Sequence, residues 1–223
     1  MEAKEEKPKS PALVIASGNK GKIAEFSRIL GAMGIVPVAL GAALGPLGLP
    51  CAVPGPEENG ATFAENAAIK AAHYSKALGM PCLADDSGLC VAALGGAPGV
   101  LSARYGGAGL DPAARNALLL EAMEGTRDRR ACFKAALCLM EPKSGGTLSW
   151  EAGVAGEIAG SPRGNGGFGY DPIFWLPSRN LTMAELSPGE KDKLSHRGLA
   201  LALMERDRDL VLRLLNINAG QGP

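Results

Sequence analysis

Short apolar runs alternate with amphipathic stretches in the first part of the chain, which predicts alternating strands and helices. The apolar run at 12–16 has the length of a buried strand. Residues 22–33 follow it with apolar side chains at helical spacing, and 35–39 has the composition of a second strand. The chain therefore opens with a predicted strand–helix–strand unit.

A connection rich in proline and glycine precedes the next predicted helix. Residues 40–60 contain both residue types repeatedly, so we expect a long loop there. Thr62 and Glu65 then have the spacing of a capping box, in which each side chain accepts hydrogen bonds from backbone N–H groups at the helix start. This signal predicts an alanine-rich helix that ends near Leu78.

Two adjacent carboxylates, Asp85 and Asp86, close the apolar run that follows this helix. Because successive side chains of a strand point to opposite faces, only one of the two is expected to face a cleft. Ser87-Gly88 is expected to turn the chain, and 89–94 to form the next strand. The two acids are either a metal ligand or general base beside a turn, or solvated acids in an ordinary turn.

The second half of the chain predicts two long strands between helices. Helices are expected from 111 to about 125, from Ser187, and from Ser195 to about Leu215. The strands are expected at 130–140 and 147–158, as neighbours joined by a short turn. Five leucines are expected to dock the last helix on the core: Leu199, Leu201, Leu203, Leu210 and Leu214.

Composition restricts the class of protein and its partners. Lys plus Arg and Asp plus Glu number 23 each, so the chain lacks the excess positive charge that binding to nucleic acid requires. No apolar stretch reaches the ~18 residues of a membrane helix. The charged residues 1–11 are expected to be a disordered tail rather than a signal peptide. The five cysteines show no CxxC spacing and are expected to be reduced, so a cytoplasmic location is expected.

A loop with two lysines, residues 17–22 (SGNKGK), joins the first predicted strand to the first helix. Backbone N–H groups at a helix N-terminus favour an anion, so this loop is a candidate phosphate site. It is not a P-loop, because the GxxxxGK[ST] pattern is absent. The alternative is a plain strand-to-helix turn with surface lysines.

Three further segments carry side chains suited to a ligand, and each has an ordinary structural alternative. Asn66, Lys70 and His73 share one helix face, which either lines a site or is a solvated stripe. The glycine-rich segment 161–172 either allows close backbone approach and aromatic stacking, or is a plain loop. His196 is either a site residue or a packed or capping histidine.

Six segments occur in the order of the motifs of one family. They are SGNKGK (17–22), ENGATFAENA (58–67), ADDSGL (84–89), GGAPGV with SARY (95–105), GGFGYDPIF (166–174) and SHRG (195–198). With these motifs the chain resembles the inosine/xanthosine triphosphate pyrophosphatases over about residues 12–215. One such motif would be weak, whereas six in order with compatible spacing make the resemblance specific.

The resemblance implies a two-lobed α/β fold in residues 12–215, with a long mixed central sheet flanked by helices and an active site in the cleft between the lobes. Residues 216–223 would then be a C-terminal tail. It implies hydrolysis of ITP, dITP and XTP to the monophosphate and pyrophosphate. It also implies a Mg²⁺ requirement and a homodimer.

The resemblance assigns roles to individual residues. Asp86 matches the catalytic proton acceptor and a metal ligand, and either Glu57 or Glu58 matches the second metal-binding carboxylate. Asp85, on the opposite strand face, is expected to brace the sheet or the turn. The other matches are substrate-binding residues: Ser17 (where the family more usually has Thr), Gly18, Asn19, Lys20, Gly21, Lys22, Lys70, Ser87, Phe168, Gly169, Tyr170, Asp171, Lys191, His196 and Arg197.

Two of the matched residues could select the purine base. Donors on His196 or Arg197 suit the 6-oxo group of hypoxanthine or xanthine, whereas the 6-amino group of adenine leaves them unpaired. Guanine also has a 6-oxo group, so rejection of GTP needs a further contact that the sequence does not identify.

Three alternative functions remain: a Maf-type pyrophosphatase for modified pyrimidine nucleotides, a nucleotide-binding regulator without hydrolysis, and a nucleic-acid-binding module. The intact ADDSG and SHR motifs argue against the first, and the balanced charge against the last.

Overall fold

The structure is a computed structural model in which residues 12–44 and 53–216 are described. The expected N-terminal tail at 1–11 lies outside these residues, as does Cys51. Of the expected C-terminal tail at 216–223, only residue 216 is described, and it still belongs to the last helix.

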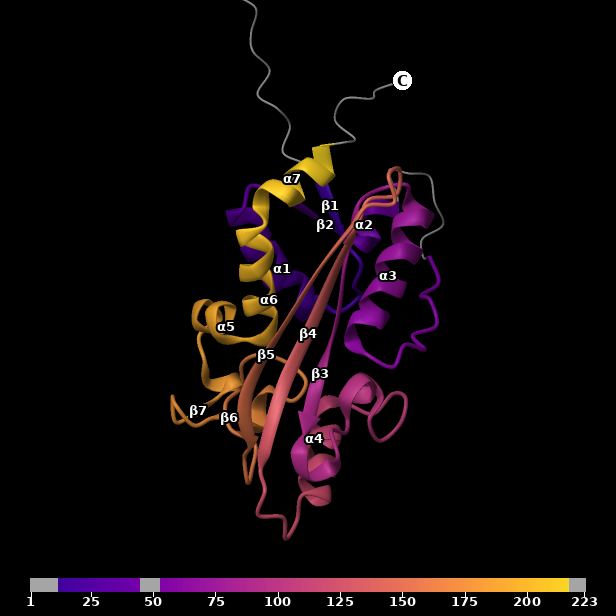
Figure 1. Cartoon of the computed structure of the whole chain (residues 1–223). Helices are drawn as coiled ribbons and strands as arrows, with labels where there is room; N and C mark the ends of the chain where they lie inside the picture. Colours follow the sequence, from indigo (N-terminus) through magenta and orange to yellow (C-terminus); the bar gives the residue numbers. More distant parts are fainter. Residues whose placement is uncertain (1–11, 45–52, 217–223) are drawn as a thin grey trace, which may run out of the picture.

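A seven-stranded mixed sheet forms the middle of the molecule (Figure 1). Its strand order is β2-β1-β3-β4-β5-β6-β7. β1 is parallel to β2 and β3, and the later neighbours are antiparallel. The strands are β1 (Ala12–Ile15), β2 (Val36–Ala39), β3 (Cys82–Val91), β4 (Arg130–Met140), β5 (Thr147–Ile158), β6 (Phe174–Leu176) and β7 (Leu181–Thr182). The long strands β3, β4 and β5 run through both halves of the molecule, which confirms the long mixed sheet.

Helices cover both faces of the upper part of the sheet in Figure 1. α3 packs on β3 and β4, and α6 packs on β4 and β5 from the other side. None of the described helices is long and apolar enough to cross a membrane. The helices are α1 (Lys20–Ala32), α2 (Leu40–Leu44), α3 (Phe63–Leu78), α4 (Pro112–Ala122), α5 (Pro188–Leu194), α6 (His196–Arg206) and α7 (Arg208–Asn216), with 3₁₀ turns at Ala92–Leu94, Gly99–Arg104, Asp171–Ile173 and Met183–Glu185.

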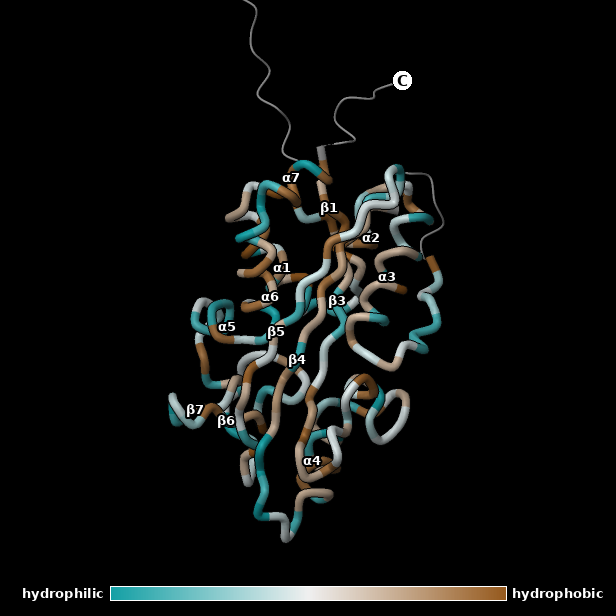
Figure 2. The backbone as a smooth tube through the Cα atoms, viewed as in Figure 1, coloured by the Kyte–Doolittle hydropathy of each residue, from teal (hydrophilic) through white to brown (hydrophobic). Residues whose placement is uncertain are grey.

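Three apolar clusters hold these layers together. One joins α1, α6 and α7 to the sheet through residues such as Phe26 and Leu201, and a second joins α3 to the opposite face through residues such as Ala71. The third surrounds Phe133 and Phe174 in the lower half. Figure 2 shows that hydrophobic residues of β1 and β4 lie between these layers. The separate lower cluster gives the second lobe its own core, as expected for a two-lobed fold.

The long strands and several helix starts confirm the sequence predictions. β4 and β5 have the expected bounds. Thr62 and Ser187 both form complete capping boxes, and Asp111 caps α4. These elements depend on local signals, because alternation and capping act over only a few residues.

β3 is one continuous strand, so the turn expected at Ser87-Gly88 and the separate strand expected at 89–94 are wrong. Each residue from Cys82 to Val91 is paired with a residue of β4, and this pairing extends the strand through the serine and glycine. The residues directly after it form a short 3₁₀ turn instead.

Gly88→Ala is expected to destabilise the fold by about 1–3 kcal/mol, because the added methyl group overpacks a close contact. A Cβ there would lie 2.3 Å from Ser102 Oγ and 2.6 Å from the Gly99 carbonyl oxygen. Ser102 is held in place, since its Oγ accepts the Leu89 N–H at 2.9 Å. Urea unfolding measures the loss, and Gly160→Ala, whose Cβ would meet nothing within 4 Å, is the control. Equal losses in the two variants would contradict the contact.

Residues 40–44 form the short helix α2 inside the segment expected to be a loop. Leucine and alanine are good helix formers, and the first proline after them is Pro46, so one turn of helix fits before the chain is interrupted. Residues 53–62 contain no helix or strand, which agrees with the expected loop in that part.

The single helix expected from Ser195 to Leu215 is two helices, α6 and α7, which meet at Asp207. Asp207 accepts the Trp150 Nε1–H at 2.7 Å, which ties the junction to β5. The docking leucines are only partly as expected. Leu201 is buried, Leu203 and Leu214 are half-buried, and Leu199 and Leu210 are exposed. Besides Leu201, the buried core contacts of these helices come from Ala200, Met204, Val211 and Leu215. Leu199, Leu201 and Leu203 are two residues apart, so they cannot all lie on one face of a helix.

Candidate active site

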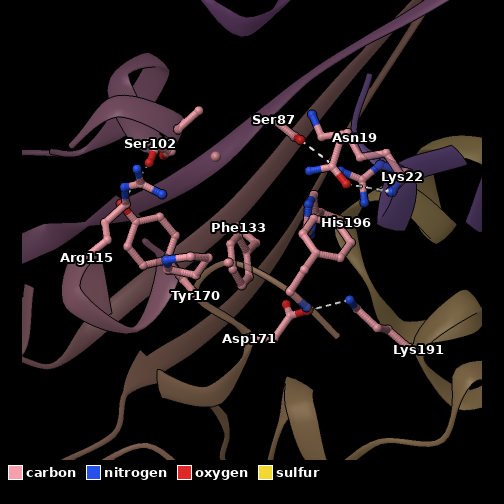
Figure 3. A pocket seen from close by; sticks show the side chains of 16 residues that line it. Asn19, Lys22, Ser87, Ser102, Arg115, Phe133, Tyr170, Asp171, Lys191 and His196 are labelled. Carbon is pink, nitrogen blue, oxygen red and sulfur yellow. Dashed lines mark hydrogen bonds and ion pairs between the residues drawn. The ribbon is translucent and has the colours of Figure 1, made fainter. Parts of the chain in front are cut away.

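Two adjoining pockets lie where β1 ends beside β3. β1 pairs with β3 only up to Leu83, so Asp85 and Asp86, which follow Ala84 in β3, lie at an open edge. Such crevices at the carboxyl ends of parallel strands are typical ligand sites. One pocket, the carboxylate pocket, has a volume of about 320 Å³ and is lined by acids and cations, among them Glu58, Lys70, Asp85, Asp86 and Arg104. The other, the aromatic pocket, has a volume of about 310 Å³ and is lined among others by Phe133, Phe168, Tyr170 and His196 (Figure 3).

The two pockets share part of their lining, so one extended ligand can occupy both. Asn19, Lys22, Ser87 and Ala103 contribute to each pocket. These residues come from the α1 N-terminus, β3 and the 3₁₀ turn Gly99–Arg104. The junction therefore lies between three segments that are far apart in the sequence.

The loop after β1 has the geometry of an anion site. α1 starts at Lys20, two residues earlier than expected, because Asn19 is its N-cap and accepts the Lys22 N–H at 3.1 Å. Ser17 Oγ accepts the Asn19 N–H at 3.1 Å, which orders the loop before the helix. Ser17, Gly18, Asn19 and Lys22 line the carboxylate pocket, whereas Lys20 is exposed and lines neither pocket.

Gly21 connects the loop to the aromatic pocket rather than lining a pocket itself. A Cβ at this position would lie 2.5 Å from Phe168 Cδ1, so only glycine allows the ring to lie directly against the helix start. The ring also lies 4.5 Å from Lys191 Nζ and 5.6 Å from the Arg197 guanidinium carbon, which are cation–π distances. Phe168 is thereby held between the helix and two cations.

Asp85 and Asp86 have different partners, as strand alternation predicts. Both line the carboxylate pocket, however, so the expectation that only one of them faces the cleft is wrong. Asp86 Oδ1 accepts a hydrogen bond from Lys70 Nζ at 2.8 Å, and its Oδ2 accepts one from Asn66 Nδ2 at 3.4 Å. Burial raises the pKa of Asp86, against the opposing effect of Lys70. A buried carboxylate with a raised pKa beside a cleft is a candidate proton acceptor.

The contacts of Asp85 differ from the expectation that this residue braces the sheet or the turn. Its side chain is fully buried and lies 2.7 Å from Lys22 Nζ and 3.1 Å from Arg197 Nη2. Burial acts to raise the pKa of Asp85, but Arg197 and Lys22 outweigh it and hold this pKa below its usual range. Asp85 therefore positions two cations of the site.

The two glutamates that the sequence left as alternatives are now distinguished by position. Glu58 lines the carboxylate pocket, and its Oε2 lies 3.0 Å from Lys70 Nζ. Glu57 is exposed and lines neither pocket. Burial acts to lower the pKa of Lys70, but Asp86 and Glu58 outweigh it and raise this pKa. The carboxylates of Asp86 and Glu58 therefore both contact the Lys70 ammonium group.

A buried ion-pair network, which sequence reasoning missed, forms the wall behind the aromatic pocket. Glu25 on α1 is paired with Arg197 Nη1 and lies 3.0 Å from Lys191 Nζ. Asp171 Oδ2 lies 2.5 Å from the same Lys191 atom and accepts the Phe168 N–H at 2.7 Å. One signal was present: Glu25 lies three residues after Lys22 and therefore on the same helix face.

His196 lies in the aromatic pocket with its ring stacked on Phe133, at 4.7 Å between centroids and 17° between planes (Figure 3). Burial, helped by the charge of Arg197, lowers the pKa of His196 well below its usual value, so the ring is neutral near pH 7. Its Nδ1 atom is buried and has no hydrogen-bond partner within the described ranges. Phe133 was not predicted, because a phenylalanine in a strand gives no signal beyond ordinary core packing.

The other predicted site residues fall into two groups. Ser87, Gly169 and Tyr170 line the aromatic pocket, and the Tyr170 hydroxyl donates to the Ser102 carbonyl at 2.9 Å. His73, from the helix face with Asn66 and Lys70, lines neither pocket and bonds the Pro54 carbonyl oxygen at 2.8 Å. Only part of that helix face therefore belongs to the site.

A model of the Ham1 family matches residues 13–207 of the chain. The chain belongs to the Ham1 family. Proteins named dITP/XTP pyrophosphatase from Syntrophobacter fumaroxidans and Thermus thermophilus are 48% and 47% identical to it. The matches cover 92% and 88% of this chain, and 84% and 92% of those proteins.

Solved structures of the family have the same fold. The Ham1 protein of Coxiella burnetii is 44% identical, with a TM-score of 0.77 over 88% of this chain and 97% of its own. The Ham1 protein of Staphylococcus aureus is 39% identical, with a TM-score of 0.76 over 89% of this chain and 98% of its own. The match covers both lobes, so the Ham1 fold includes the segments that form both pockets.

Proposed function

We propose that this Ham1-family chain hydrolyses deaminated purine nucleoside triphosphates (ITP, dITP and XTP) to the monophosphate and pyrophosphate. The observation that carries the proposal is the pair of joined pockets, one aromatic and one with carboxylates and lysines. A purine base suits the first, and a triphosphate with its metal ion suits the second. The relatives named dITP/XTP pyrophosphatase support the substrate class.

In this proposal, Asp86 orients a water molecule and accepts its proton as the oxygen attacks the α-phosphorus. The bond from the α-phosphorus to the bridging oxygen breaks, and pyrophosphate leaves with the electron pair of that bond. Lys22, Lys70 and the N–H groups of the loop after β1 stabilise the added negative charge. The burial that raises the pKa of Asp86 makes it a better base than an exposed carboxylate.

We further propose that Mg²⁺ is the cofactor and that Asp86 and Glu58 hold it. Both carboxylates contact the same atom, Lys70 Nζ, at 2.8 and 3.0 Å, so they converge on one point of the carboxylate pocket. Mg²⁺ needs only one or two carboxylates, since phosphate oxygens and waters complete its coordination. When bound, the ion offsets phosphate charge and lowers the pKa of a coordinated water.

His196→Ala is expected to reduce the preference for ITP over ATP by about tenfold, because a buried hydrogen-bonding group for the 6-oxo edge is lost. The His196 ring lines the aromatic pocket, where a purine base would lie beside it. The ratio of kcat/KM values for the two nucleotides measures the effect. His73→Ala, the only other histidine, is the control because His73 lies outside both pockets. An unchanged ratio in the His196 variant would assign base recognition elsewhere.

The experiment that tests the function is a panel of ITP, dITP, XTP, GTP, ATP and dUTP, each incubated with Mg²⁺. Pyrophosphate release from the first three supports the proposal. Preferred hydrolysis of pyrimidine nucleotides would favour a Maf-type activity, and binding without turnover a nucleotide-binding regulator. Orthophosphate as the first product would contradict attack at the α-phosphorus.

The quaternary structure and location are proposals that rest on the family resemblance. We propose a homodimer, which sedimentation at several concentrations tests by its mass. We also propose a cytoplasmic site of action, where the nucleotide pool is found. The buried Cys82 and Cys138 are free thiols, which a reducing compartment would maintain.

A further inference from the structure

Arg104 is a cation of the carboxylate pocket that has no role in the function proposed above. It is the last residue of the 3₁₀ turn Gly99–Arg104, within the SARY motif. The turn packs on β3, because Ser102 Oγ accepts the Leu89 N–H at 2.9 Å and donates to the Gly99 carbonyl at 2.6 Å. The backbone that carries Arg104 is therefore fixed, while its side chain is exposed at the pocket.

The two lysines of this pocket are already paired with carboxylates. Lys22 lies 2.7 Å from Asp85, and Lys70 lies 2.8 Å from Asp86 and 3.0 Å from Glu58. Three carboxylates thus oppose two ammonium groups before any phosphate arrives. A nucleoside triphosphate adds several further negative charges, so the two lysines and the proposed Mg²⁺ together leave part of the negative charge without a counter-charge.

Arg104 is different, because it forms no ion pair with any residue of the described ranges. Its hydrogen bond, from Nη2 to the Glu58 carbonyl oxygen, measures 3.4 Å, which is long for N–H···O. The guanidinium is therefore free to exchange this weak contact for a stronger one. Its planar fork of donors matches two phosphate oxygens at once.

The residues that line each pocket indicate which phosphates Arg104 would contact. The neighbouring residue Ala103 lines both pockets, whereas Arg104 lines only the carboxylate pocket. With the base in the aromatic pocket, the α-phosphate lies near the shared residues Lys22 and Ser87. The β- and γ-phosphates then extend into the carboxylate pocket, which is lined by Arg104 and Glu58.

We propose that Arg104 binds the β- and γ-phosphates and stabilises the pyrophosphate that leaves. On substrate binding, its side chain moves from the Glu58 carbonyl to the phosphate oxygens. The proposal deepens the proposed function and rests on it for the orientation of the nucleotide. In this proposal, the 3₁₀ turn Gly99–Arg104 places the Arg104 guanidinium beside the leaving group.

Calorimetric titration of Arg104→Gln with pyrophosphate and, separately, with inosine monophosphate tests the proposal. Pyrophosphate is expected to bind about 10- to 100-fold more weakly than to the unchanged protein, because bonds between charged groups are lost. Inosine monophosphate is expected to bind equally well. Arg104→Lys is expected to be intermediate, since it keeps the charge without the fork.

Arg130→Gln is the matched control, because Arg130 is an exposed arginine outside both pockets that is paired with Asp128 at 2.7 Å. Unchanged pyrophosphate affinity in the Arg104 variant would overturn the proposal. Equal weakening for both ligands would overturn it as well, since that result indicates a distorted pocket.

The titrations do not depend on turnover, so the two proposals can fail separately. If the unchanged chain releases no pyrophosphate from ITP, the proposed function fails. Selective loss of pyrophosphate binding in the Arg104 variant would still identify Arg104 as a phosphate ligand. If ITP is hydrolysed and pyrophosphate affinity is insensitive to Arg104, only the present inference fails.

Discussion

Asp86→Asn is expected to lower kcat for ITP about a thousandfold while the protein remains folded. Asparagine has nearly the same shape and still accepts the hydrogen bond from Lys70, so the local packing is kept. It lacks the negative charge and the basic oxygen that the proposed proton transfer needs. General base catalysis contributes roughly 100- to 10,000-fold, and the loss of a metal ligand acts in the same direction.

Pyrophosphate release under saturating ITP measures this effect, and circular dichroism with thermal unfolding reports on the fold. Asp128→Asn is the control, because this aspartate pairs with Arg130 and lines neither site pocket. Turnover that persists in Asp86→Asn with an intact dichroism spectrum would remove Asp86 from the role of base. Loss of the folded signal would instead assign Asp86 a structural part.

Asp85→Asn is expected to have the largest effect on stability, with a loss of about 3 kcal/mol. Removal of one partner from a buried ion pair typically costs about 3–5 kcal/mol, since the remaining charge is left uncompensated. The Asp85 side chain is fully buried and pairs with both Lys22 and Arg197. Glu25 still pairs with Arg197 in the variant, which places the loss at the lower end of the range.

Urea unfolding measures the loss, and Asp192→Asn is the matched control. Asp192 pairs with Arg28 at the same 2.7 Å, but the arginine side chain is 43% exposed. Exposed pairs contribute less than about 1 kcal/mol, so the control should lose little stability. Comparable losses in the two variants would contradict the importance of burial at Asp85.

The pH dependence of this stability difference follows from the pKa of Asp85. Arg197 and Lys22 hold that pKa below its unfolded value of about 3.9, against the effect of burial. The carboxylate is then ionised in both states above about pH 5, and its contribution to stability is complete there. As the pH falls through the folded-state pKa, the contribution is lost. The difference between the native chain and Asp85→Asn should therefore be constant from about pH 5 to 8 and shrink only in stronger acid.

The sequence by itself determined the elements that depend on neighbouring residues. Capping boxes at Thr62 and Ser187 and the two long strands β4 and β5 lie where they were expected. The alternation that separates Asp85 from Asp86 also follows from the strand alone. The order of the six motifs was sufficient to indicate the family, because each motif is a local string of residues.

Only the tertiary structure decided which side chains meet. Glu25 and Arg197 are 172 residues apart, and no local pattern connects them. The strand β3 continues through Ser87-Gly88 because β4 pairs with it, and a turn preference of two residues cannot oppose that pairing. The helix expected after Ser195 divides at Asp207, where the bond to Trp150 lies across the fold.

Long-range packing also explains why the sequence predicted only part of the candidate site. The sequence identified Asp86, Lys22 and Lys70 as residue types suited to phosphate and metal chemistry. It did not separate Glu58 from Glu57, and it expected Asp85 to brace the sheet or the turn rather than to pair with Lys22 and Arg197. Those distinctions depend on which side chains reach one pocket from α1, the loop at 53–62, α3 and β3. Long-range packing, rather than sequence spacing, fixes the distances between them.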